Sequence, residues 1–277
     1  MRRYKPKRKS YKTKKKKSIF RRRIFWLSFL FLLFLGGISY LILFFHFFQV
    51  KEIRISGNQK IAVANIENII NEEIGKKLIF FKTDSIFLVS LEKISKQLLE
   101  KYPLLAQVNL KKELPNILII EAKERTPAGV WCRISSQFAS QKPGEQDNKC
   151  FSIDETGVAF EETTPTEGLV IKSQVAPNSV TLGQKVIEES LLKSILEIQQ
   201  KLSSDLKIWI TEFDILSNER LNVKTLQGWE IYFNPKGNIN WQVVELGLVL
   251  EKEIPIEKVP SLEYIDLRFT KVYYKYK

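Results

Sequence analysis

The sequence predicts an α+β protein with three parts. A single transmembrane helix comes first, then a compact unit in the order strand, helix, helix, strand, strand. A second, mostly antiparallel β domain with two flanking helices follows. Three observations support this prediction. Residues 24–48 contain no Lys, Arg, Asp or Glu, apolar residues recur at helical spacing in four later stretches, and most other apolar residues lie in short runs typical of strands.

Residues 24–48 are expected to form a membrane anchor. A helix of this length would reach roughly 37 Å, which exceeds the hydrocarbon thickness of about 30 Å. A cleaved signal peptide is the alternative, but its apolar region spans about 7–15 residues and is followed by small residues at the cleavage site. The segment meets neither condition. The sequence therefore predicts an uncleaved, single-pass anchor.

The positive charge of the chain is concentrated in its N-terminal tail. Residues 1–23 hold 14 of the 44 Lys and Arg residues and no acid, which leaves 30 cations against 31 acids in the rest of the chain. Such a tail cannot bury a core, so we expect it to be disordered. The positive-inside rule places it in the cytoplasm and residues 49–277 outside. The formal charge of +13 therefore predicts topology and no specific nucleic-acid partner, although attraction to anionic lipid stays open.

Residues 49–126 are expected to fold as the compact α+β unit. Residues 50–58 form a short strand, and 104–112 and 116–124 form two more. Two amphipathic helices lie between them and cover one face of the sheet. The first is expected to end at Gly75 and the second before Pro103. The apolar stripes are Ile66, Ile69, Ile70 and Ile74 in the first helix, and Phe87, Leu91, Ile94, Leu98 and Leu99 in the second.

The second domain, residues 127–277, begins with a strand at 128–134 and a polar loop at 135–149. The only two cysteines, Cys132 and Cys150, bracket this loop. An extracytoplasmic location permits a disulfide between them. Closing a loop of this size would stabilise the fold by about 3 kcal/mol in the chain-entropy model. Two free thiols are the alternative.

Two helices and five strands are predicted further along the second domain. The first helix is expected to bury a stripe of apolar residues, and the second to turn Trp241, Val244 and Leu248 inward. Asn238 or Asn240 would cap the second helix. The expected segments are helices at 185–202 and 239–252; strands at 208–216, 220–226, 229–233, 264–269 and 272–277; and a first-helix stripe of Ile187, Leu191, Ile195, Ile198 and Leu202.

Alternation of residue types predicts the faces of three of these strands. Trp229, Ile231 and Phe233 would lie on a covered face, in a hairpin that turns at Gln227-Gly228. Ile265, Leu267 and Phe269 would share one face of the next strand. The gap at residues 270–271 is too short to fix whether the last two strands form a hairpin.

The order of these motifs resembles the FtsQ/DivIB family of bitopic bacterial cell-division proteins. A basic tail and single anchor run into VKEIRISGN at 50–58, and residues 102–127 close the first unit with Glu124-Arg125-Thr126-Pro127. The C-terminal YIDLRF at 264–269 extends the resemblance to the end of the chain. The resemblance implies a POTRA domain at 49–126 and an FtsQ-type β domain at 127–277. The loop between the cysteines is not part of it.

The resemblance also implies a function. Family members are non-enzymatic scaffolds that link cytoplasmic and extracytoplasmic division proteins at the septum. They bind FtsB-like and FtsL-like single-span partners, and their terminal strand pairs with a segment of FtsB, while the POTRA domain contributes to other recruitment. The matching positions here are Arg268 and Phe269, with Val272, Tyr273 and Tyr274 nearby. Another membrane-anchored POTRA protein, acting in secretion or envelope assembly, is the alternative.

The residues give little support for an enzyme. The only histidine, His46, lies among Phe45, Phe47 and Phe48 without neighbouring acids or thiols, so it suits neither a metal site nor a catalytic triad. No G-x-S-x-G, P-loop or zinc-ligand spacing is present. We therefore predict no catalytic residue, no metal site and no cofactor.

Overall fold

The structure is a computed structural model of the whole chain. It describes residues 23–74, 77–78, 81–82, 84–134, 149–165, 168–174 and 179–277. The chain divides into two compact units, one made of residues 1–54, 70–90 and 111–119, the other of residues 55–69, 91–110 and 120–277. The predicted helix end at Gly75 and nearly all of the predicted polar loop at 135–149 lie outside the described residues.

The N-terminal apolar segment forms helix α1 (Arg23–Phe44), which is long and apolar enough to cross a membrane. Its 22 residues reach roughly 33 Å. The helix ends four residues earlier than the expected span of 24–48, and a 3₁₀ turn, η2 (His46–Phe48), follows. It ends there because the chain next pairs with a loop: Gln49 forms a β-bridge with Ser85, and the Ile86 N–H donates to the Phe48 carbonyl at 2.9 Å.

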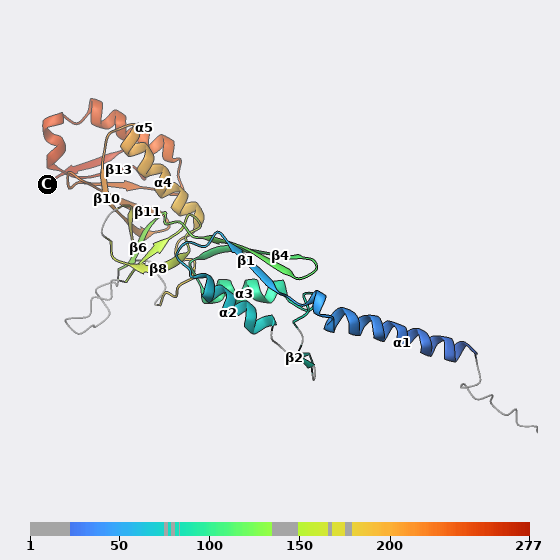
Figure 1. Cartoon of the computed structure of the whole chain (residues 1–277). Helices are drawn as coiled ribbons and strands as arrows, with labels where there is room; N and C mark the ends of the chain where they lie inside the picture. The colour runs from blue at the N-terminus through green and yellow to red at the C-terminus, as the bar shows by residue number, and fades with distance from the viewer. Residues whose placement is uncertain are drawn as a thin grey trace, which may run out of the picture. The chain divides into compact units, whose positions relative to one another are not determined.

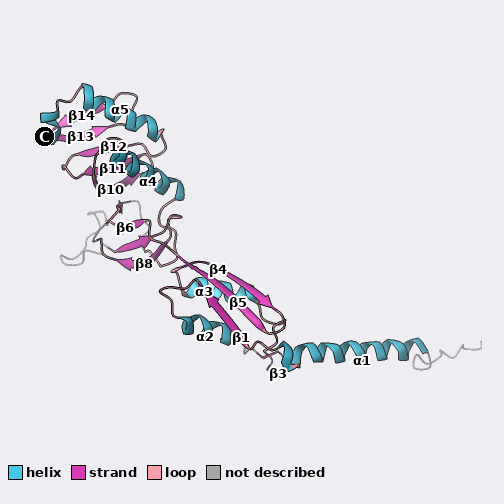
Figure 2. Ribbon diagram, turned by 45° about the horizontal axis from the view of Figure 1, so that its top comes forward, coloured by secondary structure: helices cyan, strands magenta, loops and turns pink. Residues whose placement is uncertain are grey.

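The first domain, which begins after η2 and ends with β5, contains a three-stranded sheet in the order β1-β5-β4. Figures 1 and 2 show helices α2 and α3 next to this sheet. A short antiparallel ribbon of β2 and β3, which the sequence did not predict, lies between the helices in the chain. The elements are β1 (Glu52–Ser56), α2 (Val63–Ile74), β2 (Lys77–Leu78), β3 (Phe81–Lys82), α3 (Leu91–Lys101), β4 (Leu105–Glu113) and β5 (Ile117–Glu124).

The helical stripes of this domain are largely as predicted. Ile66, Ile69 and Ile70 are buried in α2, and Ile94 and Leu98 are buried in α3. The predictions for Phe87 and Leu99 were wrong, because both residues are exposed. A turn closed by the Leu88 N–H and the Ser85 carbonyl at 3.0 Å precedes α3, so Phe87 lies before the helix and is exposed.

The second domain is built on a nine-stranded mixed sheet in the order β14-β13-β12-β11-β10-β9-β6-β7-β8 (Figure 2). β9 is parallel to β6 and to β10, and β12 is parallel to β13, whereas the other neighbours are antiparallel. The strands are β6 (Gly129–Arg133), β7 (Cys150–Ile153), β8 (Ala159–Thr163), β9 (Val170–Ser173), β10 (Ile210–Ser217), β11 (Arg220–Thr225), β12 (Glu230–Phe233), β13 (Leu262–Asp266) and β14 (Tyr273–Tyr276).

Two helices, α4 (Glu189–Ser204) and α5 (Ile239–Lys252), bury one apolar cluster with the strands, and a 3₁₀ helix, η3 (Ile256–Ser261), precedes β13. The alternation predicted for β12 is confirmed, since Trp229, Ile231 and Phe233 are buried. Gly228 closes the turn before β12 with φ of 87°, a conformation that favours glycine. In α4 the buried residue of the first turn is Leu192, and the predicted Leu191 is only partly buried.

The predicted inward face of α5 was wrong. Trp241, Val244 and Leu248 are exposed. The cause is a polar residue in the core: Gln242 is buried, donates from Nε2 to the Asn234 carbonyl at 3.0 Å and accepts the Asn234 N–H at 2.8 Å. Asn238 is the N-cap, and its side chain accepts the Trp241 N–H at 3.0 Å. The buried residues of α5 are Ile239, Gln242, Val243, Leu246 and Val249.

A buried ion pair joins the end of β5 to the β7–β8 turn. Arg125 contacts Oδ2 of Asp154, and both side chains are largely buried. Oδ1 of Asp154 accepts from the Thr156 N–H at 3.0 Å, the Thr156 hydroxyl at 2.7 Å and the Val158 N–H at 3.0 Å. Burial opposes ionisation of Asp154, but these hydrogen bonds and the Arg125 charge outweigh it and hold its pKa below the ordinary value.

Asp154→Ala should therefore lower the free energy of unfolding by about 3–5 kcal/mol, because Arg125 is left buried without its partner. The depressed pKa means that this stabilisation is complete above about pH 3.9, the value of an unfolded Asp, and is lost as the pH falls through the folded value. The control is Glu161→Ala, which breaks an exposed pair with Lys60 at 2.9 Å and should cost less than about 1 kcal/mol. Equal losses in denaturant titrations at pH 7 would contradict the assignment.

The structure joins Cys132 and Cys150, which are directly opposite on β6 and β7, with an S–S distance of 2.06 Å. Oxidation in the protein stays a prediction. Thiol labelling of the unreduced, denatured chain should find no free cysteine, and two labelled thiols would refute the disulfide. Cys132→Ser should lower the melting temperature and leave partner binding intact, because the bond constrains only neighbouring strands.

Candidate partner-binding edge

Strand β14 ends the nine-stranded sheet and pairs on one side with β13. Within the part of the chain that the structure describes, no strand pairs with its other side. The Lys277 N–H donates to the Ser261 carbonyl at 2.8 Å. Because backbone groups of alternate residues point to the same side of a strand, those of Tyr274 and Tyr276 face the open side. This edge can accept another strand.

The side chains of β14 divide between the two faces of the sheet. Tyr274 lies opposite the buried Ile265, and Tyr276, opposite the buried Leu262, packs against the core. These two tyrosines therefore lie on the face that α4 and α5 cover. Tyr273 and Lys275 lie on the other face.

The face of the sheet that α4 and α5 do not cover is called the open face here. It carries stacked aromatic and cationic groups from three strands. Tyr232 on β12 stacks on Tyr264 of β13, with ring centroids 4.9 Å apart and planes at 17°. The guanidinium carbon of Arg220, on β11, lies 4.6 Å from the Tyr232 ring centroid, within cation–π range. Burial, aided by the nearby Glu230 carboxylate, raises the pKa of Tyr232 above its ordinary value.

Arg268 is fixed at the end of β13 by Asp266. Its Nε donates to Oδ1 of Asp266 at 2.8 Å and its Nη2 to Oδ2 at 2.6 Å. This bidentate pair raises the pKa of Arg268. The guanidinium carbon lies 5.7 Å from the Tyr232 ring centroid and 5.2 Å from that of Phe269. Asp266 thus holds the cation beside the aromatic groups of the open face.

Phe269 and Tyr273 meet in the connection between β13 and β14. Their rings are 6.0 Å apart at 84°, and each side chain is 55% exposed. The expectation that Phe269 shares a face with Ile265 and Leu267 was wrong, because β13 ends at Asp266 and only the latter two are buried. β13 and β14 form an antiparallel hairpin, which the sequence left open.

The structure brings together three of the five residues proposed for partner binding. The Phe269 ring contacts both the Arg268 guanidinium group and the Tyr273 ring. Tyr274 is on the opposite face, and Val272 packs against the core. Whether any of the five contacts a partner stays a prediction.

Sequence reasoning missed Arg220, Tyr232 and Tyr264. The alternation around Ile231 already placed Tyr232 on an exposed face, and Tyr264 precedes the buried Ile265. Arg220 carried the same signal, because polar residues alternate with Leu221 and Val223 along residues 220–224.

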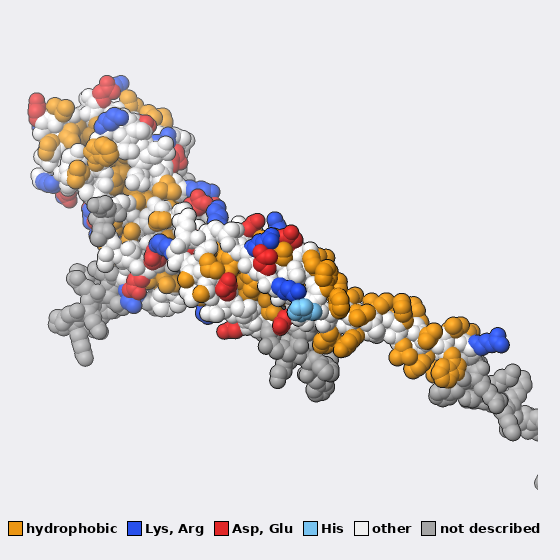
Figure 3. Space-filling view, viewed as in Figure 1, with side chains coloured by type: hydrophobic (Ala, Val, Ile, Leu, Met, Phe, Trp, Pro, Cys, Tyr) orange, Lys and Arg blue, Asp and Glu red, His pale blue; other side chains and the backbone are white. Residues whose placement is uncertain are grey.

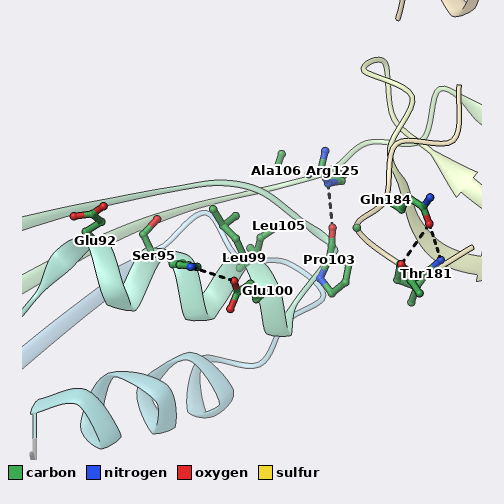
Figure 4. A pocket seen from close by; sticks show the side chains of 13 residues that line it. Glu92, Ser95, Leu99, Glu100, Pro103, Leu105, Ala106, Arg125, Thr181 and Gln184 are labelled. Carbon is green, nitrogen blue, oxygen red and sulfur yellow. Dashed lines mark hydrogen bonds and ion pairs between the residues drawn. The ribbon is translucent and has the colours of Figure 1, made fainter. Parts of the chain in front are cut away.

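A hollow of about 760 Å³ lies between α3 and the loop 181–184 (Figure 4). Three of its charged groups have partners: Lys96 and Glu100 are 3.8 Å apart, and Arg125 donates from Nε to the Pro103 carbonyl at 3.0 Å. The described residues contain no group of three or more His, Cys, Asp or Glu that could hold a metal ion. We assign no chemistry to this hollow.

The family model of the FtsQ-type POTRA domain matches residues 48–125. These residues therefore form an FtsQ-type POTRA domain, and the apolar helix before it could anchor the chain in a membrane. Both features fit the FtsQ/DivIB family and confirm the predicted α+β class. POTRA domains are non-enzymatic protein-interaction modules, which supports a protein-interaction role related to division. A comparison with curated proteins finds no match to this chain.

Proposed function

We propose that this chain is a non-enzymatic divisome scaffold of the FtsQ/DivIB type. The observation that carries the proposal is the FtsQ-type POTRA domain placed directly after an apolar helix of membrane-spanning length. The helix would anchor the chain with residues 1–23 in the cytoplasm, a POTRA domain at 49–126 and a β domain at 127–277 outside. The scaffold would link cytoplasmic and extracytoplasmic division proteins at the septum.

The proposed partners are FtsB-like and FtsL-like single-span division proteins. A segment of the FtsB-like protein would add a strand to β14, whose outer side is open. Backbone hydrogen bonds would then supply affinity, and alternate side chains of the added strand would supply specificity. Other division proteins would bind the POTRA domain.

The aromatic and cationic groups around β14 support this choice of edge. Phe269 and Tyr273 are large, exposed and held by ring contact with each other. Arg268 is oriented by its bidentate pair with Asp266. Aromatic and Arg side chains that are ordered before binding are typical anchors of an interface. We therefore propose Arg268, Phe269 and Tyr273 as the main contacts, with Val272 and Tyr274 shaping the edge.

Phe269→Ala should weaken binding by on the order of 2 kcal/mol, because it removes an exposed anchor, and should leave the melting temperature unchanged. The measurement is binding of a synthetic peptide from the segment after the coiled coil of an FtsB-like protein of the same organism. The full chain in nanodiscs is the receptor.

Ile265→Ala is the matched control, since Ile265 is fully buried and lies in β13, four residues before Phe269. It should destabilise the domain by about 2–5 kcal/mol and reduce binding only through unfolding. If Phe269→Ala lowers the melting temperature as Ile265→Ala does, Phe269 belongs to the core and the assignment fails.

A fluorescent protein fused to Met1 should give bands at the division septum in living cells. Uniform fluorescence around the envelope would instead favour the alternative, a membrane-anchored POTRA protein acting in secretion or envelope assembly. Removal of residues 273–277, which deletes β14 and keeps β13, should abolish capture of the FtsB-like partner while the truncated chain stays in the membrane fraction. Release of that chain from the membrane would show that the anchor assignment is wrong.

A further inference from the structure

The outer end of α1 is hydrogen-bonded to the loop that precedes α3. The Ser85 hydroxyl donates to the Ile42 carbonyl at 3.3 Å, and the Ile86 N–H donates to the Phe48 carbonyl at 2.9 Å. The Val50 N–H donates to the Asp84 carbonyl at 3.0 Å. All these residues belong to one compact unit. The loop is thus held directly beside the point where α1 ends.

This loop turns apolar side chains in two directions. Ile86 and Val89 are buried, whereas Phe87 and Leu88 between them are exposed. The Phe87 ring also contacts Phe48, with centroids 5.4 Å apart. Burial of the domain's own core therefore does not account for Phe87 and Leu88.

The turn between β4 and β5 lies against the same region. The Lys51 N–H donates to the Asn116 carbonyl at 3.0 Å, and the Lys112 ammonium donates to the Phe87 carbonyl at 3.4 Å. At this turn Leu114 is 60% exposed, although turns usually carry polar residues or glycine. An apolar residue there is costly to expose to water and favourable to bury in lipid.

Five exposed apolar side chains therefore lie around the outer end of α1, and we name them the anchor-side patch: Phe45, Phe47, Phe87, Leu88 and Leu114. Figure 3 shows hydrophobic side chains continuing from α1 onto the adjoining surface. Single exposed apolar residues are ordinary, but a contiguous group marks a contact surface.

We propose that the anchor-side patch is a second membrane contact, which rests in the interfacial layer of the bilayer that α1 crosses. The inference rests on the proposed function, because it requires α1 to span the membrane. At roughly 33 Å, α1 uses the whole hydrocarbon thickness of about 30 Å. Phe45 and Phe47 then lie at the outer interface, where amphipathic surfaces bury their apolar side chains about 5–10 Å deep.

Continuity with the anchor favours lipid over a protein as the occupant of the patch. The hydrogen bonds from Ser85 and Ile86 hold the loop next to the end of α1. The exposed Lys51 and Lys111 flank the patch in sequence and can approach anionic headgroups. The neighbouring acids Glu52 and Glu113 both pair with Arg54, at 2.7 and 3.5 Å, which reduces their repulsion of such headgroups.

The test places an environment-sensitive NBD probe on Leu114→Cys in the full chain. The chain is reconstituted into phosphatidylcholine–phosphatidylglycerol vesicles, and unmodified chain labelled in parallel measures any signal from Cys132 and Cys150. We expect blue-shifted emission, loss of emission with lipids spin-labelled near the headgroup and little quenching by aqueous iodide. Phe87→Cys should behave in the same way.

Leu226→Cys is the matched control, because Leu226 is 67% exposed in the β11–β12 turn and is not part of the patch. Its probe should show water-like emission and quenching by iodide. Equal lipid quenching at Leu226 and Leu114 would overturn the assignment of the patch.

The remaining outcomes separate this inference from the proposed function. If the chain floats with the vesicles but iodide quenches the Leu114 probe and spin-labelled lipid does not, the patch assignment fails and the anchor stands. Blue-shifted emission without lipid quenching would indicate contact with a second copy and would also overturn the lipid assignment. If the chain does not float with the vesicles, the anchor fails and the inference fails with it.

Discussion

Burial of one face of the nine-stranded sheet is the constraint on which the second domain depends. Trp131, Phe213 and Trp229 lie on that face under α4 and α5 with almost no exposed surface. Aromatic side chains of this size bury roughly 150–250 Å² each, so they dominate the apolar stabilisation of the domain. Because side chains alternate along each strand, covering one face sends every second residue to the other. The stacked pair Tyr232 and Tyr264 is a consequence of this alternation.

Local patterns predicted the helices and most strands, but not β7, β8 and β9, and they predicted the faces less well. The α5 boundaries were predicted correctly, but the inward face was not, because Gln242 occupies a core position that its two bonds to Asn234 make affordable. The face predicted for Phe269 was wrong for a different reason. The Asp266 side chain accepts the Arg268 N–H at 3.1 Å, which turns the chain out of the strand. Beyond that turn the two-residue period no longer predicts which face a side chain occupies.

The candidate edge shows the same limit at the level of tertiary structure. Arg268, Phe269 and Tyr273 are close in sequence, so a resemblance at the C-terminus was sufficient to propose them. Tyr232 joins them only because β12 is parallel to β13, and a parallel pair needs a crossover, here the one that contains α5. No local pattern specifies which strands pair across such a crossover. The aromatic groups of the open face could therefore be recognised one by one, but their assembly could not.

A short edge strand is consistent with a partner held in the same membrane. β14 has four residues, and each backbone hydrogen bond contributes only about 0.5–1.5 kcal/mol net, so strand addition alone gives limited affinity. For two chains anchored in one bilayer, the second contact is effectively intramolecular, at concentrations on the order of millimolar. A modest edge would then suffice, with the proposed contacts of Arg268 and Phe269 adding to the affinity. An extended apolar edge would bind more tightly, but it would also pair with wrong strands.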